Sequence, residues 1–153
     1  MKSLRITALT LAATFALTFT HGQAVAETGT PVAKPLDLQA IMKDLNSNMQ
    51  TVTDGISRED WMLIEKTAPL IADHPQPPLT EKMRIMSFMG SNMGKFKAYD
   101  GETHQAAVML GQAAKGKDAQ AVIAAFQTLQ TACHACHREF RKPFLEHFYG
   151  KRY

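Results

Sequence analysis

The chain has 153 residues, which is enough for one domain with a sizeable core, and carries 17 Lys and Arg against 14 Asp and Glu. Residues 1–26 hold two of the basic residues and none of the acidic ones, so the remainder has 15 against 14 and is nearly neutral. This balance argues against a nucleic-acid partner, which would require clustered excess positive charge. Glycine and proline are sparse and long β-branched runs are absent, which favours helices.

The N-terminus has the three parts of a secretory signal. Lys2 and Arg5 precede an apolar stretch over 6–19, and Ala24-Val25-Ala26 forms a small-x-small cleavage pattern. The apolar stretch is shorter than the roughly 20 residues that a membrane anchor needs. We therefore expect a cleaved signal peptide over 1–26, a loose leader over 27–35, a periplasmic location, and one domain over 36–153 with no membrane span.

Two helices are predicted in the first half of this domain. The first, over 36–54, has an apolar stripe with spacings of three and four, and Gly55 is expected to end it. Ser57 is expected to cap the second helix, and Pro69 to kink it because proline removes a backbone donor. The proline-rich segment over 74–78 then breaks the pattern.

Two more helices are predicted in the second half. Thr80 is expected to cap a long third helix, which ends near Lys115 and Gly116, with Gly101 as a weak point. Asp118 begins the fourth helix. Its stripe is the most regular in the chain: Val122, Phe126, Leu129, Cys133, Cys136, Phe140 and Phe144. Pro143 should bend its end. Four amphipathic helices predict an all-α antiparallel four-helix bundle.

The only two cysteines lie in Cys133-His134-Ala135-Cys136-His137, the C-x-x-C-H pattern of covalent c-type haem attachment. Two thiols three residues apart on one helix face can each add to a vinyl group of the same porphyrin. His137 lies one turn from Cys133 and can bind the iron. The pattern predicts one covalent haem c held by Cys133 and Cys136, with His137 as the proximal iron ligand.

Three other interpretations of the motif are weaker. A thioredoxin-like pair belongs to a βαβ context, and no strand pattern precedes this one. A zinc site built from Cys133, His134, Cys136 and His137 would pack four ligands into five residues, whereas structural zinc sites use separated pairs. A disulfide across two intervening helical residues would be strained.

The position of the motif near the C-terminus, on the last of four helices, resembles class II cytochromes c, the cytochrome c′ family. The continuation Arg138-Glu139-Phe140-Arg141 is also similar to the family pattern. The resemblance implies one of two iron sites. Low-spin members bind a methionine of the first helix opposite the histidine and carry electrons. Five-coordinate members leave the distal site open and bind NO or CO.

The stretch Ile41-Met42-Lys43-Asp44, with Met49 two turns further on, resembles the ligating segment of the low-spin members. The resemblance therefore implies Met42 as the sixth iron ligand and Met49 as the fallback. The competing interpretation is core filling, a common role of methionine, and the chain has nine of them.

Other residues receive weaker predictions. His74, His104 and His147 are expected at the surface or at helix caps rather than on a metal. Gly90 and Gly94 could permit close approach of a porphyrin or of a neighbouring helix.

The leading functional prediction is a periplasmic electron carrier that is not an enzyme. The alternative is a gas-binding protein with an open distal site. A third hypothesis is a structural or metal-handling helical protein whose histidines and methionines bind zinc or copper. Redox partner proteins cannot be identified from the sequence, and the resemblance allows a homodimer through the first two helices.

Overall fold

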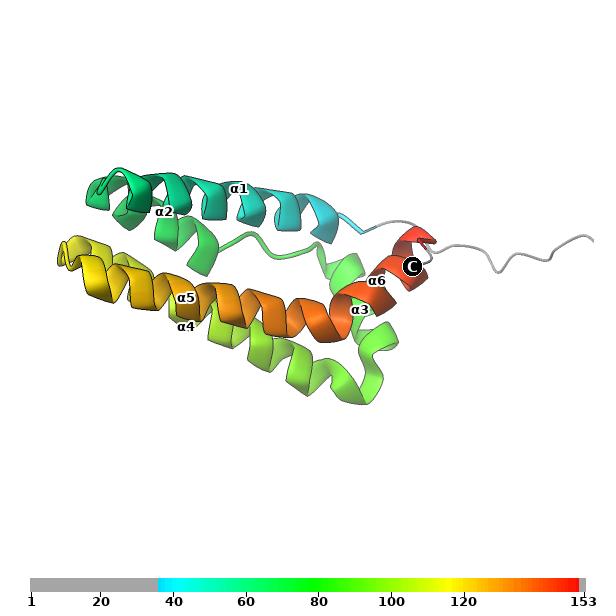
Figure 1. Cartoon of the computed structure of the whole chain (residues 1–153). Coiled ribbons are helices and arrows are strands. Elements are labelled where there is room, and N and C mark those ends of the chain that lie inside the picture. The colour runs from blue at the N-terminus through cyan, green and yellow to red at the C-terminus, as the bar shows by residue number, and fades with distance from the viewer. Residues whose placement is uncertain (1–35, 152–153) are drawn as a thin grey trace, which may run out of the picture. The chain divides into compact units, whose positions relative to one another are not determined.

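The computed structural model describes residues 36–151, and within that range the chain is helical with no strand. The elements in chain order are α1 (Leu38–Ser57), α2 (Trp61–Ala72), α3 (Leu79–Met89), the 3-10 turn η1 (Gly90–Asn92), α4 (Met93–Lys115), α5 (Ala119–Cys136), the π-helical segment η2 (His137–Arg141) and α6 (Lys142–Tyr149). The four longest helices form a bundle (Figure 1), so the predicted fold class is confirmed. The predicted signal peptide and leader lie outside the described residues.

The bundle is held by one large apolar core. α1 packs on α2, α2 on α4, and α4 on α5. The fully buried members of this core are Val52, Ile64, Ala107, Leu110, Val122 and Leu129. We call this set and the smaller residues around it the bundle core. Within the described range, no helix is long and apolar enough to cross a membrane.

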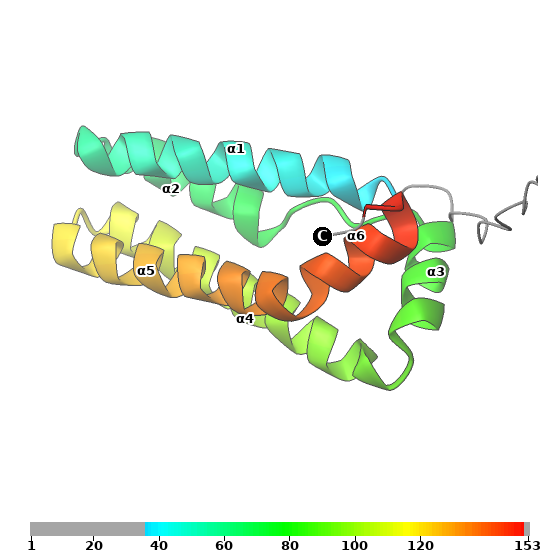
Figure 2. The same cartoon turned by 45° about the vertical axis from the view of Figure 1, so that its right-hand side comes forward.

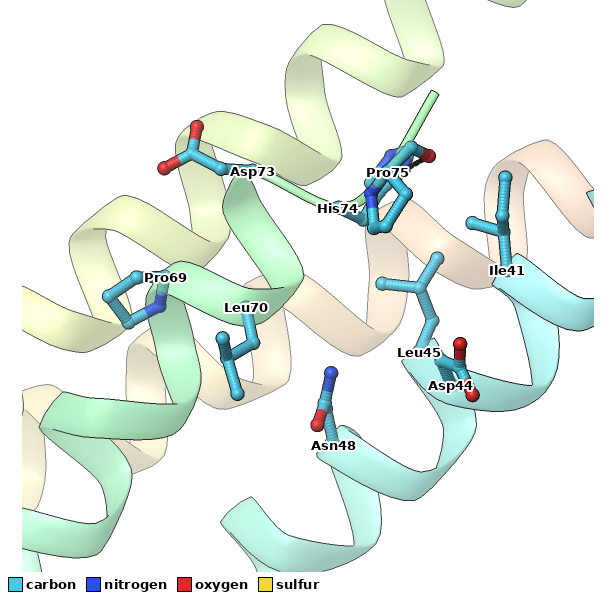
Figure 3. A pocket seen from close by; sticks show the side chains of 9 residues that line it. All are labelled: Ile41, Asp44, Leu45, Asn48, Pro69, Leu70, Asp73, His74 and Pro75. Carbon is cyan, nitrogen blue, oxygen red and sulfur yellow. Dashed lines mark hydrogen bonds between the residues drawn. The ribbon is translucent and has the colours of Figure 1, made fainter. Parts of the chain in front are cut away.

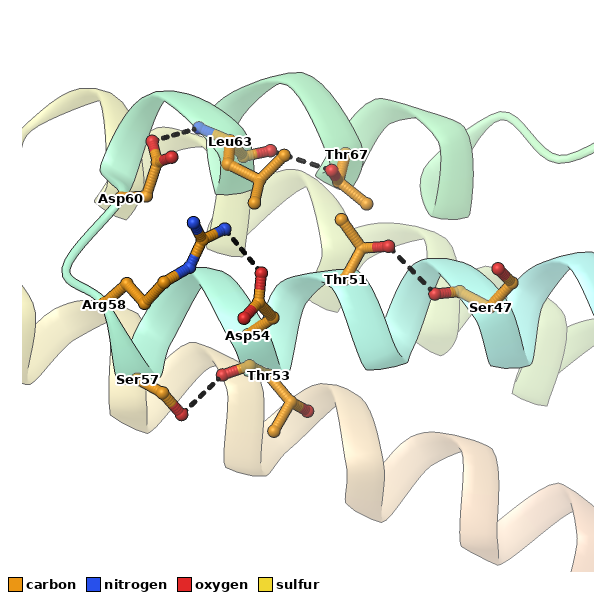
Figure 4. A network of polar contacts seen from close by, with 9 residues as sticks. All are labelled: Ser47, Thr51, Thr53, Asp54, Ser57, Arg58, Asp60, Leu63 and Thr67. Atoms are coloured by element: carbon orange, nitrogen blue, oxygen red, sulfur yellow. Dashed lines mark hydrogen bonds and ion pairs between the residues drawn. The ribbon is translucent and has the colours of Figure 1, made fainter.

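The turn from α1 to α2 differs in detail from the prediction. α1 continues past Gly55 to Ser57, and the Ser57 hydroxyl donates to the Thr53 carbonyl of its own helix, 2.9 Å away. Asp60 caps α2 instead, because its carboxylate accepts from the Leu63 backbone N–H at 3.0 Å (Figure 4). The predicted Ser57 cap is therefore wrong. α2 continues through Pro69 to Ala72.

The predicted third helix is two helices. Gly90 has a φ of +51°, a conformation that glycine adopts without steric cost, and α3 ends there. After η1 the chain resumes as α4, which continues through Gly101 and ends at Lys115 before Gly116, as predicted. α3 begins at Leu79 after Pro78 and has no side-chain cap, so the predicted Thr80 cap is also wrong.

The last helical stretch changes geometry at the haem motif. Asp118 caps α5 as predicted, accepting from the Ala121 N–H at 3.0 Å. α5 ends at Cys136, and η2 leads into α6, with Pro143 in the first turn of α6. Pro143 has no N–H to donate into the preceding turn, which accounts for the altered hydrogen bonding there. Figure 2 shows the chain bending at this point, so that α6 runs toward the N-terminal end of α1.

A second core lies at this end of the molecule. Its buried members are Leu36, Ile85, Met89, Phe140, Phe144 and Phe148. We call it the aromatic cluster. Phe96 stacks on Phe144 with ring centroids 5.6 Å apart, and Phe88 meets both Phe144 and Phe148 edge-on at 5.4 and 5.2 Å. Such pairs stabilise the packing of α3, α4 and α6 beyond simple area burial.

Candidate haem site

The two cysteines lie at the C-terminal end of α5, both half-buried and neither in a disulfide. Cys133 packs against the bundle core and Cys136 against the aromatic cluster. Burial raises the pKa of the Cys133 thiol. Burial also raises the pKa of the Cys136 thiol to about 11, with smaller contributions from negative charge on Asp100, Cys133 and Glu139. Both sulfurs are therefore neutral thiols near pH 7.

His137 is the first residue of η2 and follows Cys136 directly. Burial lowers the pKa of its imidazole, and the positive charges of Arg141 and His134 lower it further. The neutral imidazole is the form that binds a metal. π-helical turns inside helices are frequent at functional sites. The local structure thus presents His137 in a form suited to iron.

Hydrogen bonds to the Glu139 carboxylate connect η2 to α4. Lys95 donates to one of its carboxylate oxygens at 2.6 Å and Tyr99 to the other at 3.1 Å. The hydrogen bond from Lys95 is the main reason that the pKa of Glu139 lies below its ordinary value. This contact fixes the segment that carries His137.

A cavity of about 450 Å³ opens beside His137, within the size range of ligand sites. One wall comes from α1, and the others come from α4, η2 and α6. Its lining residues are Leu38, Gln39, Met42, Lys43, Asn46, Phe96, His137, Phe140, Arg141, Phe144, Leu145 and Tyr149. Aromatic rings thus form much of the lining, while Met42 and His137, the two predicted iron ligands, reach it from different elements.

Of the residues predicted to hold haem or its iron, only Met42 and His137 line this cavity. Met49, the fallback ligand, does not line it and packs against the bundle core. Neither cysteine is among the lining residues, although both precede His137 on the same helical stretch. No atom of a neighbouring element lies within 4 Å of where a Cβ would be at Gly90 or Gly94, so neither glycine lies in a close helix contact in this structure.

The three other predicted histidines have different partners. His104 Nδ1 donates to the last carbonyl of α2, Ala72 O, at 2.9 Å. His74 bonds Asp100 at 3.2 Å, and the His147 ring stacks on Phe88. The capping role predicted for His104 and the surface position predicted for His147 agree with the structure, whereas the His74 side chain is only 12 % exposed.

A second cavity, of about 520 Å³, lies between α1, α2 and the segment that follows α2 (Figure 3). Ile41, Leu45 and Leu70 contribute apolar atoms, while Asp44 and His74 contribute polar ones. It contains none of the residues predicted to hold haem. The chemistry of the lining residues, and not the volume of the cavity, therefore identifies the candidate haem site.

The zinc interpretation finds no support in the geometry. Among residues 36–151, no group of three or more His, Cys, Asp or Glu side chains could hold a metal ion.

A protein-family model described as Cytochrome C' matches residues 37–141. The chain belongs to the cytochrome c′ family. The match runs from the start of α1 to the end of η2 and includes Met42, Cys133, Cys136 and His137. As a member of the cytochrome c′ family, the protein is a haem-binding cytochrome. A comparison with curated proteins gave no match.

The residues fit such a group. A cavity lined by aromatic rings, one imidazole and one thioether would suit a flat apolar haem, whose iron His137 and Met42 would hold. Sequence reasoning missed Phe96, the Glu139 contacts and Tyr149. Gln39 and Asn46 could have been found, because they lie three and four residues from Met42 and so share its helix face. Tyr149 and Phe96 gave no such local signal.

Proposed function

We propose that this protein is a periplasmic electron carrier with one haem c, attached through Cys133 and Cys136 and bound at the iron by His137 and Met42. The observation that carries the proposal is that Met42 and His137 line one cavity from two different elements, α1 and η2. When bound, the haem supplies a one-electron couple between Fe(III) and Fe(II).

The environment of Met42 argues against core filling. Its side chain is 38 % exposed and belongs to neither the bundle core nor the aromatic cluster. Methionines that fill cores are buried, as Met89 is at 5 %. Met49 is half-buried, packs against the bundle core and does not line the cavity. Met42 is therefore the better candidate for the distal position.

The choice of distal residue decides the function. A thioether opposite the histidine completes the coordination of the iron and favours the reduced state, which suits electron transfer. A distal side without a ligand would leave room for a diatomic gas. The protein around the site contributes an apolar wall of Phe96, Phe140 and Phe144, which limits water access and so also influences the reduction potential.

The test is the visible spectrum of the oxidised and reduced holoprotein, with and without CO, for wild type, Met42→Ala and Met49→Ala. The wild type should be low-spin and bind CO slowly, because CO must displace the thioether. Met42→Ala should become high-spin, bind CO much faster and have a lower reduction potential, whereas Met49→Ala should keep the wild-type spin state.

Two results would contradict this proposal. A wild type that is high-spin and binds CO rapidly would identify a gas-binding protein instead. A low-spin wild type whose spin state changes in Met49→Ala but not in Met42→Ala would place the ligand two turns along α1.

A further inference from the structure

The two residues that precede α1 are fixed by three contacts with distant parts of the chain. The Leu36 side chain is 3 % exposed and belongs to the aromatic cluster. The Leu36 carbonyl accepts from the Tyr149 hydroxyl of α6 at 2.9 Å. The Asp37 N–H donates to a carboxylate oxygen of Glu81 of α3 at 2.6 Å. The start of α1 is thus attached to both α3 and α6.

These contacts hold the part of α1 that borders the cavity. Leu38, Met42 and Asn46 line one side of it, and Phe140 and Phe144 line another. Because the cavity lies between them, this part of α1 packs little on η2 and on the first turn of α6. α1 packs on α2, but α2 has 12 residues against the 20 of α1, and it lies beside the C-terminal part of α1; Figure 2 shows the N-terminal end of α1 next to α6. The contacts of Leu36 and Asp37 set the position of this end relative to η2 and α6.

Glu81 is an unusual residue for a purely stabilising contact. It is 7 % exposed, and its second carboxyl oxygen is buried with no hydrogen-bond partner in the described structure. A buried polar atom without a partner costs free energy that one hydrogen bond does not clearly recover. A residue with this cost is better explained by where it holds the chain than by how much it stabilises the fold.

The distance to Met42 is short. Met42 lies five residues after Asp37, which corresponds to about 7.5 Å along a helix. A shift of the first turn of α1 would therefore move Met42 by nearly the same amount. We infer that Glu81 and Tyr149 are positioning residues that hold Met42 at the distance and angle needed for the iron. This inference rests on the proposed ligation by Met42.

The test compares the rate of CO binding and the high-spin fraction of the holoprotein in Tyr149→Phe, Glu81→Ala and Glu81→Gln. Tyr149→Phe and Glu81→Ala should each speed CO binding by about 2- to 10-fold, the change that corresponds to one lost hydrogen bond. Glu81→Gln keeps an acceptor for Asp37 N–H and should stay near wild type. Ser57→Ala, which removes a hydroxyl at the other end of α1, should leave the rate unchanged.

Stability and a double variant separate the possible explanations. A merely structural role would lower the free energy of unfolding in urea and leave CO binding unchanged, which would overturn the inference. In a Met42→Ala background the effect of Tyr149→Phe on CO binding should disappear, because it acts through Met42. If it persists at full size, Tyr149 acts by opening the cavity and the inference is wrong. If Met42→Ala alone leaves the spin state unchanged, the proposed ligation fails instead.

Discussion

Replacement of Gly55 by alanine tests the packing between α1 and α2. Gly55 is buried in the last turn of α1. A Cβ built there would lie 2.7 Å from Cγ1 of Ile64 and 3.4 Å from the carbonyl oxygen of Asp60. Ile64 is fully buried in the bundle core, so it has little room to move away. The substitution should therefore destabilise the protein, although alanine is the better helix former.

Two opposing terms set the size of the effect. Alanine gains roughly 0.5–1 kcal/mol over glycine within a helix. Carbon atoms normally approach to about 3.5–4.0 Å, so Ile64 must shift by about 1 Å. Overpacking of this kind costs about 1–3 kcal/mol. The two ranges leave a net loss of about 0–2.5 kcal/mol, and we expect Gly55→Ala to lower the free energy of unfolding by roughly 1 kcal/mol and Tm by roughly 2–4 °C in a domain of this size.

The matched control is Gly101→Ala in α4, where no atom lies within 4 Å of the added Cβ. Only the helix-propensity term applies there, so this variant should be stabilised by about 0.5–1 kcal/mol. Urea unfolding of both holoproteins, followed by circular dichroism, measures the difference. If Gly55→Ala is as stable as Gly101→Ala, the close contact with Ile64 is not a constraint and the reasoning is refuted.

Two more predictions concern the haem and the pH dependence of stability. Because thioether bonds survive acid–acetone extraction, the wild type should retain its haem and the Cys133→Ala, Cys136→Ala double variant should lose it; full retention in that variant would exclude covalent attachment. The hydrogen bond with Asp100 raises the pKa of His74 above its ordinary 6.5, and the same bond lowers the pKa of Asp100 below its ordinary 3.8. The pair therefore stabilises the fold fully only between about pH 4 and 6.5, and its contribution falls as pH rises through the raised His74 value. Asp100→Asn should cost about 0.2–1 kcal/mol at pH 5.5 and less at pH 8.5, measured by urea unfolding, and an equal cost at both values would contradict the assignment.

The bundle could be predicted because burial imposes a helical period on the sequence. The apolar stripes predicted for the first and last helices pack into the bundle core, with Val52 from α1 and Val122 and Leu129 from α5. The break at Gly90 could not be predicted in the same way. Met89 and Met93 lie on either side of it and keep a spacing of four, so the apolar pattern continues while the backbone does not.

The ends of the helices were harder to predict than the helices themselves, for a related reason. Ser57 and Asp60 are both good caps, and the choice depends on whether the chain turns before or after Arg58. That choice is made by tertiary packing, which no local pattern contains.

Some residues of the candidate site could be predicted from a local pattern and others could not. Cys133, Cys136 and His137 form a local motif, so their spacing alone identified them. Met42 was identified only by resemblance, because nothing in its own neighbourhood distinguishes an iron ligand from a core methionine. Tyr149 and Glu81 contact the start of α1 across 113 and 44 residues of chain. Contacts at such separations arise only from the folded arrangement.

The π-helical segment η2 has a consequence for the phase of the helix that follows it. Cys136, Phe140, Phe144 and Phe148 are spaced four apart and span 12 residues, whereas three α-helical turns take up only about 11. In an uninterrupted α-helix this stripe would drift around the axis by about 1.2 residues, or about 120°. A π turn holds one residue more than an α turn and absorbs that difference. One extra residue beside His137 thus keeps the rings of α6 in phase with Cys136, so that the same helical stretch contributes to the bundle core before the haem motif and to the aromatic cluster after it.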